Sequence, residues 1–190
     1  VGGISIIGTT GIVKPKSVDA YKASLALELN VLRAQGHTQA VLVLGYVGEK
    51  YAQETLKIKK DILVKIGDHV GFMLEQCAKK GFEKALLIGH IGKMIKLAGG
   101  QFDTHCRSGD RRISLMAQYA RSCGASESTV REILKQTTAE ATVAILEKAG
   151  LAEVFDKINK EVVAKASAFV HDKIVIQSVL LTLEGKALGN

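Results

Sequence analysis

The chain alternates short apolar runs with glycine loops and helical segments, and this order limits the folds open to it. The runs cover residues 4–7, 40–44, 62–66 and 85–88, and a glycine directly follows each of them. Continuous apolar runs predict strands that are buried on both faces, and helices between them predict parallel crossovers. We therefore expect an α/β fold with a mostly parallel sheet and helices on both faces. Right-handed crossovers would bring the four glycine loops to one edge of that sheet.

The segments between the runs predict amphipathic helices. The helix after Ser17 should bury residues spaced three and four apart, namely Val18, Tyr21, Leu25, Leu29 and Leu32. A second helix is expected over 49–60. Asp68 should cap a third over 69–80, whose inner face would be Val70, Met73, Leu74 and Cys77.

After residue 107 the pattern changes to a helical segment followed by a closing C-terminal strand. Helices are expected over 110–122, 128–135, 139–148 and 151–170, and the strand over 174–183 at an edge of the sheet. Residues 108–150 would then be a helical excursion within a single α/β domain that covers 1–190. The chain begins at Val1 and enters a strand almost at once, so we interpret it as a fragment of a longer protein.

Composition narrows the possible classes of function. A chain that is 47% hydrophobic and 24% charged is globular, and no apolar run is long enough to span a bilayer. Three cysteines without a CxxC pair favour a reducing cytoplasm. The net charge of +7 would attract a polyanion, either a nucleic acid or a small polycarboxylate. An aromatic content of 5% and the lack of a nucleic-acid-binding signature argue against nucleic acid.

Two glycine loops carry candidate binding residues. The first, Gly8-Thr9-Thr10-Gly11, offers backbone amides and two hydroxyls to a cofactor, or is an ordinary turn that precedes a helix. It has neither the GxGxxG nor the P-loop spacing, so it indicates neither a nicotinamide nor ATP. The second places His90 and Lys93 at a helix start, where the helix dipole favours an anion, whereas Lys96 is expected to be exposed.

The Asp103-x-His105 sequence that follows has several interpretations. The aspartate could orient the imidazole as an acid–base pair, or both residues could simply hold the loop together. A metal site could draw on His90, His105, Cys77 and Cys106, although no pair has the short spacing of a zinc site. The pattern also misses the cobalamin-binding DxHxxG, because Gly109 comes one residue too late. Arg107, Asp110, Arg111 and Arg112 fit either a salt-bridged helix start or carboxylate recognition.

Three phrases of the sequence are recognisable together. They are ISIIGTTGIVKPKS over 4–17, Gly67-x-x-Val70-Gly71-Phe72, and GHIGKMIKLAGG over 89–100 followed by Asp103-Thr104-His105. They resemble CbiD, the cobalt-precorrin-5B C1-methyltransferase family of anaerobic cobalamin biosynthesis. The resemblance implies an N-terminal domain that this chain lacks. It also implies methyl transfer from S-adenosylmethionine to C1 of a cobalt corrinoid, giving cobalt-precorrin-6A.

The resemblance assigns expected roles to individual residues. Gly8, Thr9, Thr10, Gly11, Gly67 and Gly71 would approach the S-adenosylmethionine cofactor. His90, Lys93, Thr104 and Arg107 would bind the corrinoid substrate, and His105 is the catalytic candidate for proton handling. The cobalt would arrive inside the substrate, so we expect no protein-bound metal. We expect neither nucleic-acid nor membrane partners, and the sequence does not indicate an oligomeric state.

Two alternatives remain open from the sequence. The chain could be a corrinoid- or cofactor-binding module that is inactive without its N-terminal half. It could also be a basic domain that binds nucleic acid through its positive charge. A sulfonium methyl donor is already activated, and its transfer needs alignment in a water-poor pocket more than an acid–base triad. The lack of a recognisable triad is therefore compatible with the methyltransferase interpretation.

Overall fold

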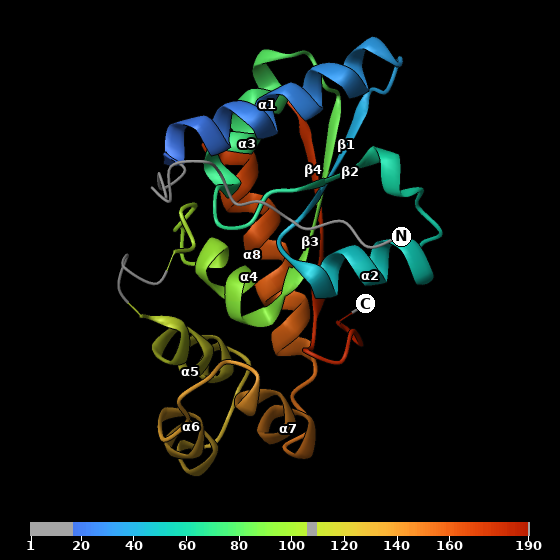
Figure 1. Cartoon of the computed structure of the whole chain (residues 1–190). Coiled ribbons are helices and arrows are strands. Elements are labelled where there is room, and N and C mark those ends of the chain that lie inside the picture. Colours follow the sequence, from blue (N-terminus) through green and yellow to red (C-terminus); the bar gives the residue numbers. More distant parts are fainter. Residues whose placement is uncertain (1–16, 106–109, 190) are drawn as a thin grey trace, which may run out of the picture.

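A computed structural model describes residues 17–105 and 110–189 of the chain (Figure 1). Within these residues the sheet has five strands in the order β2-β1-β3-β4-β5. They are β1 (Gln39–Val43), β2 (Leu63–Lys65), β3 (Lys84–His90), β4 (Val175–Leu181) and β5 (Ala187–Leu188). The first four are parallel, and β5 is antiparallel to β4. The predicted α/β class with a mostly parallel sheet is thus confirmed, while the run over 4–7 lies outside the described residues.

The strand register places the carboxyl ends of the parallel strands level with one another, at the same end of the sheet. Val43 of β1 pairs with both Lys65 of β2 and Ile88 of β3, and His90 of β3 pairs with Leu181 of β4. The loops that leave these four strands therefore start side by side. We call this end of the sheet the carboxyl rim, and α/β proteins commonly bind ligands outside the carboxyl ends of their strands.

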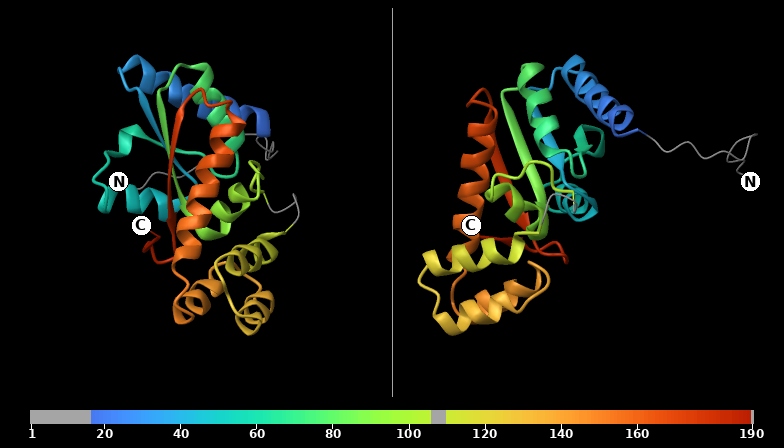
Figure 2. Two further views of the ribbon diagram at one scale, coloured as in Figure 1. Left: turned by 180° about the vertical axis from the view of Figure 1, so that it is seen from behind. Right: turned by 90° about the vertical axis from the view of Figure 1, so that its left-hand side faces the viewer.

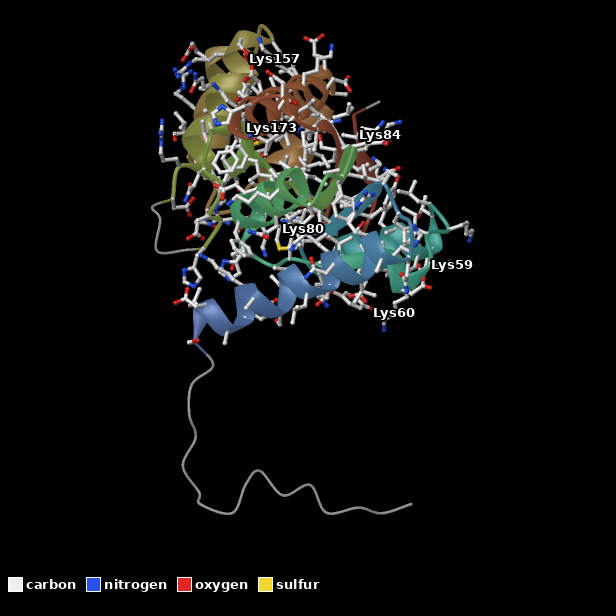
Figure 3. The ribbon with its side chains drawn as sticks, turned by 90° about the horizontal axis from the view of Figure 1, so that it is seen from above. Lys59, Lys60, Lys80, Lys84, Lys157 and Lys173 are labelled. Carbon is white, nitrogen blue, oxygen red and sulfur yellow. The ribbon has the colours of Figure 1, made fainter. Side chains whose placement is uncertain are left out.

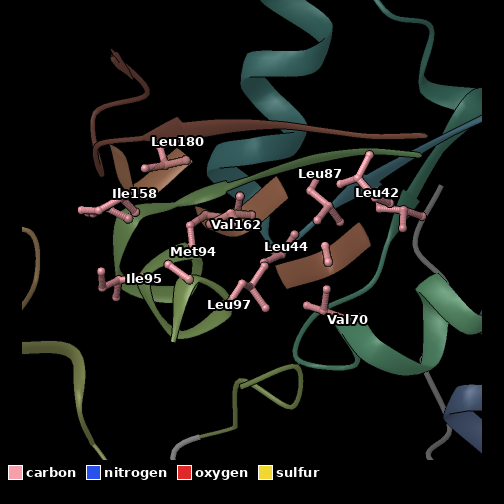
Figure 4. Packing of buried hydrophobic residues seen from close by; sticks show 14 of the residues in the cluster. Leu42, Leu44, Val70, Leu87, Met94, Ile95, Leu97, Ile158, Val162 and Leu180 are labelled. Atoms are coloured by element: carbon pink, nitrogen blue, oxygen red, sulfur yellow. The ribbon is translucent and has the colours of Figure 1, made fainter. Parts of the chain in front are cut away.

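Helices cover both faces of the sheet, as the sequence predicted. On the larger side lie α1 (Val18–Ala34), α3 (Val70–Lys79), α4 (Ile91–Ala98) and α8 (Glu153–Phe169). Leu42 and Leu87 of the sheet belong to the core on this side together with Val162 of α8 (Figure 4). On the other side, α2 (Tyr46–Glu54) packs through Ala52 on Val43. An added Cβ at Gly48 would lie 2.6 Å from the Ile88 carbonyl oxygen, so only glycine lets α2 approach this closely.

The predicted helical excursion consists of α5 (Arg112–Ser122), α6 (Glu127–Leu134) and α7 (Ala141–Lys148). Figure 2 shows these helices gathered at one end of the molecule, beyond α4. Ser126 caps α6 by accepting a hydrogen bond from the Thr129 amide, 3.2 Å away. The chain then enters α8, whose buried residues Phe155, Ile158, Val162 and Ala166 share one face, as predicted.

Four details of the sequence prediction are wrong. Val18 and Tyr21 are exposed, because α1 turns its first turns away from the core and buries only Leu25, Leu29 and Leu32. Helix α2 begins at Tyr46 and ends at Glu54 rather than covering 49–60. The strand β4 is not at the edge of the sheet, since β5 pairs with its free side. The side chain of Asp68 does not cap α3, because it is bonded elsewhere in the carboxyl rim.

Candidate functional site

A cavity of about 380 Å³ opens at the carboxyl rim. Its walls come from the loop after β2, the end of β3, α4, the segment after α4 and the start of α5. The lining residues are Asp68, His90, Gly92, Lys93, Lys96, Thr104, His105, Asp110 and Arg112. Four predicted site residues, His90, Lys93, Thr104 and His105, are therefore brought together. We call this space the first cavity.

A short antiparallel pairing connects the loop after β2 to the segment after α4. The Thr104 amide donates to the Asp68 carbonyl over 3.1 Å, and the Gly71 amide donates to the Phe102 carbonyl over 3.0 Å. His69 and Asp103 face each other between these bonds as a β-bridge. We call residues 68–71 and 102–104 the clamp. It holds together two segments that are more than thirty residues apart in the chain.

Asp68 is the bonded carboxylate of the first cavity. Its Oδ1 accepts from the Thr104 hydroxyl at 2.8 Å and lies 3.1 Å from the Lys93 ammonium. Partial burial alone would raise the pKa of Asp68. The bonds from Thr104 and Lys93, with the positive charges of Lys93 and His105, outweigh burial and hold the pKa below its ordinary value. Asp68 is therefore an ionised partner for the lysine rather than a candidate proton donor.

Lys93 ties three rim segments together. Its ammonium donates to the carbonyl of Leu44, at the end of β1, over 2.9 Å, and pairs with Asp68 of the loop after β2. The backbone of Lys93 lies in the first turn of α4. About a third of its side chain is exposed, so the charge still reaches the cavity. The predicted substrate-binding role for Lys93 is compatible with this placement.

Lys96 is a further residue that the sequence prediction placed wrongly. Its side chain lines the first cavity, but the residue is only 6% exposed, and its ammonium donates to the Thr104 carbonyl over 2.9 Å. Burying a charged group is costly unless it is paired or hydrogen-bonded. Nothing local in the sequence signals this burial, because Lys93 and Lys96 lie three residues apart on one face of α4, which is the pattern of an ordinary solvent-exposed face.

His90 has both of its ring nitrogens engaged. Its Nδ1 accepts from the Gly92 amide over 3.1 Å and caps α4, while its Nε2 lies 2.7 Å from a carboxylate oxygen of Glu140. Since Nδ1 accepts, Nε2 carries the proton and donates to Glu140. The second Glu140 oxygen accepts from the Leu183 amide over 2.9 Å. His90 thus joins α4 to the helical excursion, and Glu140 is a partner that the sequence did not indicate.

Arg112 and Asp110 form a two-pronged ion pair at the start of α5. The guanidinium Nε donates to Oδ1 over 2.8 Å, and Nη2 donates to Oδ2 over 2.6 Å. The hydrogen bonds from Arg112 hold the pKa of Asp110 at about 2. This is the salt-bridged helix start that the sequence suggested. Because Arg112 also lines the first cavity, its positive charge contributes to the field there.

The charged side chains that line the first cavity carry more positive than negative charge. Lys93, Lys96 and Arg112 supply positive charge, and Asp68 and Asp110 supply negative charge. Each carboxylate forms an ion pair with one cation, Asp68 with Lys93 and Asp110 with Arg112. Among residues 17–105 and 110–189, the Lys96 ammonium forms no ion pair within 4 Å and bonds a neutral carbonyl instead, although its charge helps to lower the pKa of Asp110. The lining therefore suits an anion that can reach Lys96.

His105 lines the first cavity, and its backbone amide donates to Asp103 Oδ1 over 3.2 Å. Gly67 precedes the clamp and Gly71 belongs to it, and neither lines the first cavity. Gly67 needs its positive φ of 58°, and a Cβ at Gly71 would come within 2.9 Å of the Phe102 Cβ. Local backbone conformation and packing therefore explain why these two positions are glycine, and their role in binding the cofactor remains a prediction. Gly8, Thr9, Thr10, Gly11 and Arg107 lie outside the described residues.

The described residues contain neither a metal-binding cluster nor a membrane-spanning helix. In residues 17–105 and 110–189, no three His, Cys, Asp or Glu side chains converge as they would around a metal ion. None of the helices in these ranges is long and apolar enough to cross a membrane. Cys77 and Cys123 are free thiols, and burial raises the pKa of Cys77 to about 12, so that thiol is a core residue rather than a nucleophile.

Comparison with known proteins connects this chain to one family. Residues 103–190 match the family described as CbiD, C-terminal domain. The chain is 40% identical, over 97% of its length, to a cobalt-precorrin-5B C(1)-methyltransferase of Thermoanaerobacter sp. (strain X514). It is 39% identical over its whole length to the protein of that name from Methanococcus vannielii, and 38% to that from Methanocaldococcus jannaschii. These matches confirm the resemblance that the sequence phrases indicated.

The chain spans about half the length of the curated relatives it matches, between 50% and 52% of each of these three. No solved structure matches it. The sheet contains strands from both sides of residue 103, where the family match begins. Strand β3 (Lys84–His90), before that residue, pairs along its whole length with β4 (Val175–Leu181), which follows it. Residues 103–190 therefore share a sheet and a core with the residues before them.

The Asp68 pair predicts a pH-dependent contribution to stability. An Asp68→Asn variant keeps an acceptor for Thr104 but loses the charge that Lys93 faces. Because the pKa of Asp68 is lowered in the folded state, its contribution is present above the unfolded pKa, near 3.8, and is lost as pH falls through the folded pKa. We expect the variant to be less stable than the parent at pH 7, by under about 1 kcal/mol for a partly exposed pair.

Urea unfolding between pH 7 and pH 3 measures this difference. The gap between the parent and Asp68→Asn should close as pH falls below 4. The exposed Asp61→Asn variant serves as the control and should follow the parent throughout. A gap that stays constant over this range would show that the Asp68 charge does not act as described.

Proposed function

We propose that this chain, whose residues 103–190 match the C-terminal domain of the CbiD family, is the corrinoid-binding part of a cobalt-precorrin-5B C1-methyltransferase. The enzyme would act in the cytoplasm, in anaerobic cobalamin biosynthesis, and would give cobalt-precorrin-6A. The observation that carries the proposal is the buried Lys96 ammonium beside Lys93 and Arg112 at the carboxyl rim. The names of the relatives support the reaction.

A corrinoid precursor carries acetate and propionate arms that are carboxylates at neutral pH. A cavity of about 380 Å³ suits one or two such arms rather than a whole macrocycle. The ring would then lie across the carboxyl rim while its arms enter the first cavity. Lys96 offers its buried ammonium, and Lys93 and Arg112 add donors that can partly exchange their aspartate partners for substrate carboxylates.

When bound, S-adenosylmethionine would supply a methyl group on an activated sulfonium. The residues of the chain would then align the two reactants and exclude water, which are the main needs of such a displacement. His105 lines the first cavity and is the candidate for holding a proton during the step. His90 acts at one remove, because Gly92 and Glu140 occupy its two nitrogens. It positions α4 rather than reaching the substrate through either nitrogen.

The nucleic-acid alternative receives less support from the distribution of charge. Figure 3 labels lysines from several elements, among them Lys59, Lys84 and Lys173, and they are spread across the view rather than gathered in one patch. Lys59 precedes β2, Lys84 begins β3 and Lys173 precedes β4. All three therefore lie at the amino ends of the strands, at the end of the sheet opposite to the first cavity. The acidic residues Asp61, Glu83 and Asp172 are interspersed with them in the sequence. The surface charge is therefore mixed rather than a continuous basic stripe.

Replacing Lys96 by methionine tests the proposed function. Lys96→Met keeps an apolar side chain of similar size but leaves the Thr104 carbonyl without its donor, so we expect a loss of stability of about 1–3 kcal/mol. Circular dichroism confirms that the variant is folded before binding is measured. The probe is dicyano-cobyrinic acid, a cobalt corrinoid with free carboxylate arms, measured by titration calorimetry. The parent should bind this acid and not its fully methyl-esterified form. Lys96→Met should bind it at least about tenfold more weakly, and the exposed-site control Lys59→Met should bind it like the parent.

Two results would contradict the proposal. Equal binding of the acid and its ester would show that the carboxylates are not recognised. Undiminished binding by Lys96→Met would remove the buried ammonium from recognition. Salt-sensitive binding of a short DNA duplex in place of the corrinoid would favour the nucleic-acid alternative.

His105→Ala, made in the whole enzyme that contains this chain, tests the catalytic assignment. Loss of a proton-handling group commonly lowers turnover by about a hundredfold or more. Methyl transfer to the corrinoid should fall accordingly. His171→Asn is a suitable control, because His171 lies before β4 at the opposite end of the sheet. Unchanged turnover in His105→Ala would exclude His105 from the chemistry.

A further inference from the structure

A second cavity, of about 360 Å³, collects an unusual share of the aromatic residues of the chain. Three of the five phenylalanines, Phe72, Phe102 and Phe169, line it. All three are half-buried, whereas Phe82 and Phe155 are buried in the core. Leaving three phenylalanine side chains partly open at one place exposes apolar surface that a flat ligand could cover.

The aromatic rings of the second cavity are held by contacts among themselves and with their neighbours. The ring centroids of Phe102 and Phe169 are 4.3 Å apart with the planes tilted by 32°. The Lys22 ammonium lies 5.6 Å from the centroid of Phe72, and the His69 ring lies 5.6 Å from that of Tyr21. The rings are thus fixed before any ligand arrives, which reduces the entropic cost of stacking against them.

One exposed carboxylate, that of Asp103, also lines the second cavity. Its Oδ1 accepts from the His105 amide, which fixes the orientation of the side chain. An ionised carboxylate can accept several hydrogen bonds through its two oxygens, so Asp103 keeps acceptor capacity for a ligand. Gly100 also lines this cavity, and nothing lies within 4 Å of the position of an added Cβ there.

The clamp is the common wall of the two cavities. Asp68 and Thr104 of the clamp line the first cavity, and its residues His69, Gly71, Phe102 and Asp103 line the second. A ligand in the second cavity and one at the first would therefore lie side by side, separated by the thickness of the clamp.

We infer that the second cavity binds the nucleoside part of the methyl donor. The adenine would stack on the partly exposed phenylalanine rings, since base–aromatic stacking needs only a free π face. The Asp103 carboxylate would accept hydrogen bonds from the ribose hydroxyls, which is how acidic residues hold the ribose in many nucleotide sites. This inference rests on the proposed function, because it places the donor beside the cavity assigned to the corrinoid.

The test pairs a protein variant with a matched change in the ligand. The parent should bind adenosine about tenfold more tightly than 2′,3′-dideoxyadenosine, because only adenosine has the hydroxyls that a carboxylate can accept from. Asp103→Asn keeps Oδ1 as an acceptor for the His105 amide but loses the carboxylate charge. Asp103→Asn should lower the preference for adenosine over dideoxyadenosine to about twofold. The control Asp61→Asn changes an exposed aspartate in the 3₁₀ turn at Lys60–Ile62 and should keep the tenfold preference.

A second variant tests the stacking. Phe72→Leu should weaken the binding of both nucleosides by a similar factor of about ten and leave the ratio of their affinities unchanged. Circular dichroism confirms that each variant is folded. An undiminished ribose preference in Asp103→Asn would overturn the inference, as would failure of adenosine and S-adenosylhomocysteine to bind the folded parent at millimolar concentration.

The cobyrinic acid titration separates this inference from the proposed function. Asp103→Asn should bind the corrinoid like the parent, because Asp103 lies on the other side of the clamp. Corrinoid binding without nucleoside binding would overturn only the nucleoside site. Nucleoside binding that follows the predicted ratios, without corrinoid binding, would support the site and contradict the proposed function.

Discussion

The buried ammonium of Lys96 is the constraint on which the carboxyl rim depends. A lysine that is 6% exposed needs a strong acceptor, and the Thr104 carbonyl provides one at 2.9 Å. That bond fixes the segment after α4, so its backbone can pair with residues 68–71 and its threonine hydroxyl can reach Asp68. One charge therefore organises the first cavity and also the wall that it shares with the second.

The helical excursion completes the rim from outside the sheet. Glu140, at the start of α7, accepts from His90 at the end of β3 and from the Leu183 amide after β4. Arg112 brings a further cation from the start of α5. The residues that match the CbiD C-terminal domain thus contribute an inner strand, a helix cap partner and part of the cavity lining. The site is built by both parts of the chain together.

The sequence predicted what depends on local pattern. Continuous apolar runs indicated parallel strands, and the glycines after them indicated a common edge where His90, Lys93, Thr104 and His105 do meet. It did not predict long-range polar pairing. Asp68 resembled a helix cap because its bond to Thr104 joins positions 36 residues apart, and the bond between His90 and Glu140 joins positions 50 apart. Lys96 was misplaced because helical spacing alone does not show that a helix is enclosed on every side.

The central claim is that the carboxyl rim, and not another basic surface, receives the carboxylates of a corrinoid. Amide chemical shifts of the isotope-labelled chain during titration with dicyano-cobyrinic acid test this claim most directly. The largest shifts should occur at Gly92, Lys93 and Thr104, with smaller changes along α4. Shifts centred on Lys80, Lys84 and Lys173, at the opposite end of the sheet, would contradict this claim.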